Sequence, residues 1–187
     1  MFEFQGKTLD SDRILISGPP GSGKSKLLEQ WRIQSKGVLI KHPKKTEVDS
    51  ELLVGAMELM QNHPTLWREF VESWNSVCGP AMINNHSTPF GISLRWTNHS
   101  ALDMSDSQVI VFCILLQIFQ LKIQEPGIRL PLFVERADFG LHPAWQRRLL
   151  KELQKFGQPL VITTYSEYLA GMFSLSQTVL MEDFSVG

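Results

Sequence analysis

The chain has 187 residues, of which 43% are hydrophobic and 20% are charged, and its formal net charge is −1 at pH 7. This composition is typical of a globular domain with its own core, and a charge near zero gives no broad basic surface for nucleic acid or an anionic membrane. The two cysteines, Cys78 and Cys113, form neither a disulfide framework nor a metal-site spacing, and the longest apolar run, residues 109–119, is too short to span a bilayer. We expect a single cytoplasmic domain over residues 1–187 with no membrane partner.

The first strongly patterned stretch predicts a strand, a loop and a helix. Residues 13–17 form a short apolar run typical of a buried strand, and residues 24–34 have the periodicity of a helix. An alternating segment before them, residues 2–4, fits an edge strand. The loop between strand and helix matches the pattern G-x-x-x-x-G-K-[ST] at every fixed position. Its residues are Gly18, Pro19, Pro20, Gly21, Ser22, Gly23, Lys24 and Ser25.

This loop has the chemistry of a phosphate-binding site. Glycines let backbone N–H groups turn toward an anion, and the start of the following helix adds a partial positive charge. Lys24 is expected to reach the β- and γ-phosphates of a nucleotide, and the Ser25 hydroxyl to bind Mg²⁺. The alternative is a glycine-rich turn without a ligand.

The region from residue 42 to residue 102 predicts a small helical lobe. The basic residues at 41–45 fit a solvated loop better than a contact with phosphates or nucleic acid. Helical periodicity then runs up to His63-Pro64, where proline interrupts it, and resumes afterwards. Residues 79–97 lack a clear pattern and are expected to form a loop.

The rest of the chain alternates short apolar runs with helical patterns. Strands are expected at residues 38–40, 130–134, 160–163 and 178–181, and helices at residues 109–123, 144–156 and 168–173. This alternation predicts an α/β fold with a mostly parallel sheet flanked by helices. Because ligands bind at the carboxyl ends of parallel strands, the residues after 13–17, 130–134 and 160–163 are expected to converge on one site.

Four segments, in the same order along the chain, resemble the ATPase heads of the ABC/SMC/RecF/OLD group. They are the loop 18–25, similar to the Walker A motif; residues 104–108, similar to the L-S-G-G-Q signature; residues 132–143, similar to Walker B and the D-loop in the form h-h-h-D-E-P-E-x-G-L-H-P; and residues 161–166, similar to the I-x-T-T-H-S switch. The resemblance implies a P-loop NTPase fold that binds ATP and Mg²⁺. It also implies that two heads enclose ATP, with Ser105 and Gln108 of one head contacting the γ-phosphate held by the other.

Four positions depart from the family pattern. Glu135 stands where the family has the aspartate associated with Mg²⁺, and Arg136 replaces the glutamate that polarises the attacking water. Tyr165 replaces the switch histidine, where it would cover the nucleotide or simply pack, and Ser107 replaces the second signature glycine. Arginine cannot act as a general base, but its charge would neutralise phosphate, whereas Glu135 keeps a carboxylate for the metal. A register shifted by one residue would make Glu135 the catalytic glutamate and leave Val134 at the metal position.

These residues predict a head that binds ATP with Mg²⁺ and hydrolyses it slowly or not at all. Ser25 and Glu135 are the expected metal ligands, and Lys24 and Glu135 are the residues expected to contribute to catalysis. We expect a nucleotide-dependent assembly switch, either an ATP-dependent homodimer or a complex with an effector protein such as a nuclease, the effector being an analogy with the family. A nucleic-acid partner is not supported by the net charge. The alternatives are a small-molecule or nucleotide kinase on the same loop and a non-catalytic scaffold.

Some of these residues also have purely structural interpretations. Ser105 and Gln108 would serve equally well as a helix N-cap and its first turn. His142, before a proline, is expected to shape the turn into the next helix rather than to move protons. A ring for adenine stacking is suggested only by where the family places it, which here points to Phe2 or Phe4.

Overall fold

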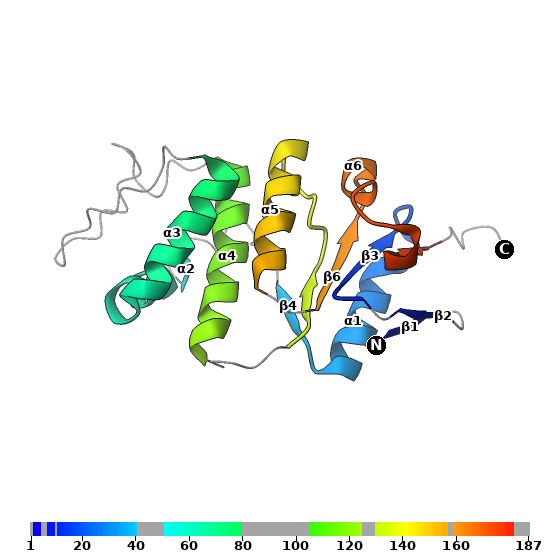
Figure 1. Cartoon of the computed structure of the whole chain (residues 1–187), viewed down its shortest axis with the longest axis horizontal. Helices are drawn as coiled ribbons and strands as arrows, with labels where there is room; N and C mark the ends of the chain where they lie inside the picture. Colours follow the sequence, from blue (N-terminus) through cyan, green and yellow to red (C-terminus); the bar gives the residue numbers. More distant parts are fainter. Residues whose placement is uncertain are drawn as a thin grey trace. The chain divides into compact units, whose positions relative to one another are not determined.

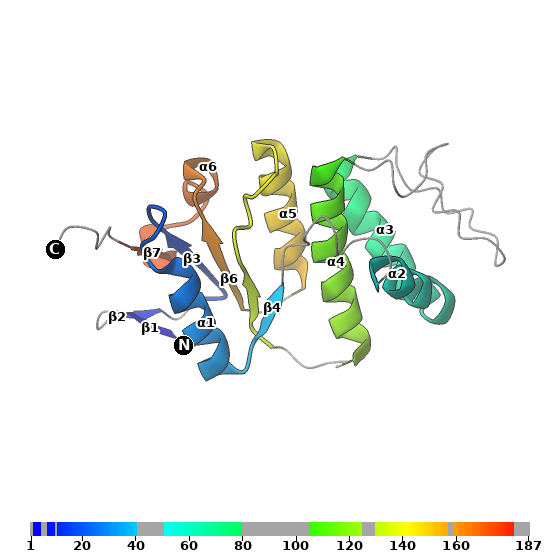
Figure 2. The same ribbon diagram turned by 180° about the vertical axis from the view of Figure 1, so that it is seen from behind.

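The computed structural model describes residues 2–4, 7–9, 11–40, 51–79, 105–124, 130–156 and 159–181. The chain forms two compact units, one made of residues 1–41 and 128–187 and the other of residues 42–127 (Figures 1 and 2). The second unit begins where the helical lobe was predicted and extends beyond residue 102 to include the long apolar helix. The basic residues 41–45 and the expected loop at 80–97 lie outside the described residues.

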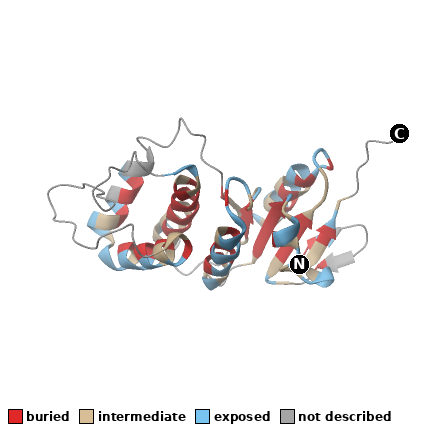
Figure 3. Cartoon of the chain, turned by 90° about the horizontal axis from the view of Figure 1, so that it is seen from above, coloured by how far each residue is buried: buried red, intermediate tan, exposed pale blue. Residues whose placement is uncertain are grey.

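The first unit is built on a five-stranded parallel sheet in the order β4-β5-β6-β3-β7. The strands are β3 (Arg13–Ser17), β4 (Val38–Ile40), β5 (Leu132–Val134), β6 (Leu160–Thr164) and β7 (Thr178–Leu180). β6 lies between β3 and β5, and all five of its residues are buried (Figure 3). The predicted α/β architecture with a parallel sheet is confirmed.

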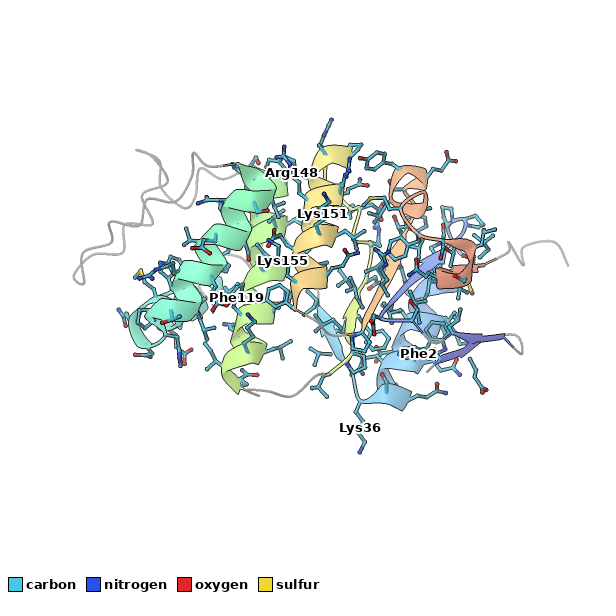
Figure 4. The ribbon with its side chains drawn as sticks, in the orientation of Figure 1. Phe2, Lys36, Phe119, Arg148, Lys151 and Lys155 are labelled. Atoms are coloured by element: carbon cyan, nitrogen blue, oxygen red, sulfur yellow. The ribbon has the colours of Figure 1, made fainter. Side chains whose placement is uncertain are left out.

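Helices flank this sheet and connect its strands. They are α1 (Lys24–Ser35), α5 (Pro143–Lys155), α6 (Glu167–Ala170) and the short 3-10 helix η2 (Leu175–Gln177). The helix expected at 168–173 is shorter than predicted, because the N–H groups of Met172 and Phe173 bond the carbonyls three residues back and so close tight turns. On α5, the basic residues Arg148, Lys151 and Lys155 are exposed, and Figure 4 shows them along this helix.

Aromatic side chains pack beside the sheet in the core of the first unit. The short strands β1 (Phe2–Phe4) and β2 (Lys7–Leu9) pair antiparallel, apart from the main sheet. The Phe2 ring lies 5.0 Å from the Trp31 ring and 5.9 Å from the Phe133 ring, between centroids, and is buried. Phe2 therefore stabilises the core rather than offering an open face to a base, and the side chain of Phe4 lies outside the described residues.

The described residues of the second unit form α2 (Glu51–Asn62), α3 (Pro64–Cys78) and α4 (Asp106–Gln124). The predicted break at His63-Pro64 is confirmed, with Pro64 at the first position of α3, where its missing N–H costs nothing. Phe70 of α3 packs edge-on against Phe112 and Phe119 of α4, with centroids 5.2 and 5.6 Å apart.

α4 is apolar around most of its circumference. Within the described part of the chain it is the one helix long and apolar enough to cross a membrane by length and composition, being longer than the apolar run inside it. More than half of its most apolar window is buried in the structure, which is also the pattern of a core helix.

Candidate functional site

The loop of residues 18–25 joins the end of β3 to the start of α1. Gly23 is the N-cap of α1 and has a φ of 86°, in the left-handed region that glycine adopts without steric cost. α1 has no acidic residue in its first turn, so the partial positive charge of its amino end is not offset there. Such a helix start, with its N–H groups directed outward, is suited to an anion.

The end of β7 packs closely against the first residue of this loop. Gly18 has a φ of 150°, and a Cβ added there would lie 2.4 Å from the Met181 carbonyl oxygen. Met181 N–H in turn donates to the Ser17 carbonyl at 2.7 Å. Only glycine fits at position 18, so the backbone there lies closer to its neighbours than any other residue would allow.

Lys24 extends into the loop from the first position of α1. The side chain is 4% exposed, and its Nζ donates to the carbonyl oxygens of Gly18 at 2.7 Å and Pro19 at 2.6 Å and to Ser22 Oγ at 3.3 Å. Burial lowers the pKa of Lys24 below its usual range, and the Asp138 carboxylate partly opposes this shift. The loop thus contains a buried ammonium beside the helix start, which is the charge that a phosphate needs.

The hydroxyl of Ser25 donates a hydrogen bond to Glu135 Oε1. Ser25 is exposed and Glu135 is half-buried, and Glu135 follows directly after β5. Within the described residues no group of three or more His, Cys, Asp or Glu side chains is placed to hold a metal ion. One hydroxyl and one carboxylate fit Mg²⁺, which takes oxygen ligands and completes its shell with phosphate oxygens and water.

Arg136 has a backbone conformation unusual for a non-glycine residue. Its φ is 50°, and its N–H donates to Thr163 Oγ1 at 2.8 Å. The guanidinium carbon lies 4.2 Å from the centre of the Phe139 ring and 5.3 Å from the centre of the Tyr165 ring. These contacts fix the cation of Arg136 at the edge of the site.

Asp138 joins the turn after β5 to the end of β6. Its Oδ1 accepts hydrogen bonds from Thr164 Oγ1 at 2.7 Å and from Tyr165 N–H at 3.3 Å. The predicted convergence of the segments that follow the strands is confirmed, because the residues after β3, β5 and β6 contact one another here. This contribution of Asp138 was not predicted, since it depends on which strand lies beside β5.

The Tyr165 ring covers the Lys24 ammonium. Lys24 Nζ lies 4.0 Å from the centre of the ring, and the tyrosine remains 41% exposed. Tyr165 was expected either to cover the nucleotide or to pack; its ring contacts Lys24 of the loop, and covering of a nucleotide remains a prediction.

Ser105 and Gln108 form a capping box at the start of α4, in the second unit. Ser105 N–H donates to Gln108 Oε1 at 2.7 Å, and Gln108 N–H donates to Ser105 Oγ at 3.3 Å. The alternative in which this pair caps the helix is therefore the one observed. Contact with a γ-phosphate in another head remains a prediction, and Met104, the first residue of the motif, lies outside the described residues.

Two polar residues shape the start of α5. His142 is the N-cap, accepting from Ala144 N–H at Nδ1 over 3.3 Å, as expected for a residue that forms the turn. Gln146 is buried and was not singled out from the sequence; its Nε2 donates to the Leu141 carbonyl at 2.9 Å, and its Oε1 accepts from Ser166 Oγ at 2.9 Å. A polar residue on the inward face of an amphipathic helix was the signal that could have found it.

No family model matches the chain, and no curated protein matches it. Any functional assignment therefore depends on the geometry of the site and on the resemblance of its four segments.

Proposed function

We propose that the chain binds ATP with Mg²⁺ at the loop of residues 18–25 and uses the nucleotide as an assembly switch, with slow or no hydrolysis. The observation that supports this best is the hydrogen bond between Ser25 and Glu135. It brings a hydroxyl and a carboxylate together next to a glycine loop and a buried lysine, which are the groups that a magnesium–nucleotide site needs.

Each part of the loop has a distinct task in this proposal. Backbone N–H groups at the start of α1 bind the phosphates, and Lys24 neutralises their charge. Ser25 and Glu135 would bind the metal ion, which supplies further charge neutralisation on the phosphate oxygens. The fold then corresponds to a P-loop NTPase, with the second unit as a helical insertion.

Weak hydrolysis follows from the groups that surround the loop. Arg136 stands where the resembling family has its glutamate, and a guanidinium cannot accept a proton at ordinary pH. Asp138 already accepts two hydrogen bonds from the end of β6, and Glu135 accepts one from Ser25. The arrangement favours tight binding and charge neutralisation over the orientation of an attacking water.

The switch itself is supported by the resemblance. ATP enclosed between two copies would stabilise the pair through its greater affinity for the closed state. Ser105 and Gln108 would complete the site of the second copy, or an effector protein would supply that surface.

The first test is nucleotide binding by the wild-type chain and two variants. ATP with Mg²⁺ should raise the melting temperature of the wild type, because a ligand that binds only the folded state stabilises it by mass action. Lys24→Ala should abolish the rise, whereas Lys26→Ala, at an exposed position of the same helix, should keep it.

Hydrolysis and assembly complete this test. Steady-state phosphate release should be slow, and sedimentation should show a larger mass with ATP and Mg²⁺ than without. The absence of any Lys24-dependent stabilisation would overturn nucleotide binding. Rapid ATP turnover that depends on Lys24 would contradict the proposed slow hydrolysis. An unchanged sedimenting mass would contradict the proposed assembly switch.

A further inference from the structure

All three N–H donors of the Lys24 ammonium are used within the loop of residues 18–25. An ammonium group has three N–H donors, and Nζ of Lys24 has three acceptors: the carbonyl oxygens of Gly18 and Pro19 and the hydroxyl of Ser22. A phosphate oxygen that bonds this ammonium must therefore replace one of these acceptors.

The Tyr165 ring favours the arrangement in which Lys24 bonds the loop. Its centre lies 4.0 Å from Nζ, well within the range in which an aromatic face attracts a cation. The contact is strengthened because the ammonium is buried and so has lost most of its water.

The position of Tyr165 is set by the protein on both sides of the residue. Asp138 accepts from the N–H of Tyr165 and from the hydroxyl of Thr164, and Ser166 donates its hydroxyl to the buried Gln146. The ring is therefore placed by a framework of hydrogen bonds to the turn after β5 and to α5, and not by local packing alone.

We propose that Tyr165 is a positioning residue that weakens nucleotide binding by competing with phosphate for the Lys24 ammonium. The inference depends on the proposed function, since it concerns the affinity of the same loop. It makes Tyr165 an affinity brake, meaning that the loop binds nucleotide less tightly than it would without the ring.

The direct test is titration calorimetry of Tyr165→Leu and Tyr165→Phe with ATP and with inorganic pyrophosphate, both in Mg²⁺. Leucine removes the aromatic face, so the affinity for both ligands should rise roughly two- to thirtyfold, the range of a cation–π contact. Phenylalanine keeps the face and loses the hydroxyl, so its affinity should equal that of the wild type. Tyr165 is 41% exposed, and melting curves of both variants would confirm that the fold is kept.

Lysine labelling gives a readout that needs no nucleotide. Acetylation of Lys24 by a water-soluble N-hydroxysuccinimide ester, followed by peptide mass spectrometry, should be faster in Tyr165→Leu than in the wild type or Tyr165→Phe. Leucine in place of the ring leaves the amine more open to the reagent, so the difference in labelling rate reports on the contact between the ring and Lys24. The exposed Lys26 serves as the internal reference.

The outcomes separate this inference from the proposed function. Tighter ATP and pyrophosphate binding in Tyr165→Leu alone, with faster labelling, supports the brake. Weaker or unchanged binding in Tyr165→Leu, a gain with ATP but not pyrophosphate, or a loss in Tyr165→Phe overturns it while leaving nucleotide binding in place. Failure of every variant and of the wild type to bind either ligand overturns both.

Discussion

The hydroxyl of Ser25 bonds the carboxylate of Glu135, although the two residues are 110 positions apart in the chain. The parallel sheet makes this contact, because β3 and β5 both flank β6 and end at the same edge. Ser25 begins the helix after one strand, and Glu135 directly follows the other. This pair of a hydroxyl and a carboxylate is the basis of the proposed magnesium site at this edge of the sheet.

Substitution of Glu135 should weaken the magnesium-dependent part of ATP binding. Glu135→Gln keeps the size of the side chain and removes its charge, so metal affinity should fall roughly tenfold or more. The loss would show as a higher Mg²⁺ concentration at half-maximal ATP binding in fluorescence titrations. Glu135→Asp should lose less, and Glu167→Gln, an exposed carboxylate on α6, should match the wild type. Equal Mg²⁺ dependence in Glu135→Gln and the wild type would exclude Glu135 from the metal site.

Replacing Arg136 should reveal whether a missing base limits hydrolysis. Arg136→Glu introduces the residue of the resembling family, and a general base contributes about 10²–10⁴ in rate. Steady-state ATPase assays should therefore show a clear gain over the wild type, removed again by Lys24→Ala. No gain in a variant that still binds ATP would mean that another group limits the rate.

Loss of the Asp138 carboxylate should destabilise the first unit. Asp138→Ala removes the acceptor of two hydrogen bonds and leaves the buried Thr164 hydroxyl without it, at a cost of about 1.5–3 kcal/mol. Urea unfolding should report a lower midpoint with an unchanged slope. Asp138→Asn retains an acceptor oxygen and should lose less, so an equal loss in the two variants would contradict the hydrogen-bonding account.

Two glycines should respond in opposite ways to alanine. A Cβ at Gly37 would lie 2.3 Å from Phe133 Cε2 and 2.7 Å from the Pro131 carbonyl oxygen, so Gly37→Ala should destabilise by about 1–3 kcal/mol. At Gly171 the nearest such atoms are 3.5 and 3.6 Å away, and Gly171→Ala should be neutral or stabilise by up to about 1 kcal/mol. Chemical denaturation of both variants tests the pair, and similar midpoints would contradict the close contact at Gly37.

The two cysteines should differ in reactivity. Burial raises the pKa of the Cys113 thiol to about 12, whereas Cys78 is half-buried. Iodoacetamide at pH 8 should therefore modify Cys78 well before Cys113 in the native protein, and both equally in urea. Because the native state favours the protonated Cys113 thiol, its contribution to stability is present below the ordinary thiol pKa of about 8.5 and is lost as pH rises towards about 12.

The sequence was most informative where a pattern is local. The strand at 13–17, the glycine loop and the following helix were predicted because apolar periodicity and fixed glycines lie within a few residues of each other. The helix at 168–173 was predicted too long, because tight turns after Ala170 are set by individual hydrogen bonds.

Contacts between segments that are distant in the sequence were harder to predict. That Asp138 would bond the end of β6, and that the Tyr165 ring would lie over Lys24, depends on which strands are neighbours. Arg136 adopts a left-handed φ that its residue type does not suggest. Such positions are determined by tertiary packing, so the sequence pattern predicts the region in which these residues lie but not the residues that they contact.

The most direct test of the central claim is a crystal structure grown with a non-hydrolysable ATP analogue and Mg²⁺. We predict phosphate density against the backbone N–H groups of the loop from Gly18 to Ser25, with a metal ion bound by Ser25 Oγ and the Glu135 carboxylate. A loop without phosphate at saturating nucleotide, or a nucleotide bound elsewhere on the chain, would contradict the account.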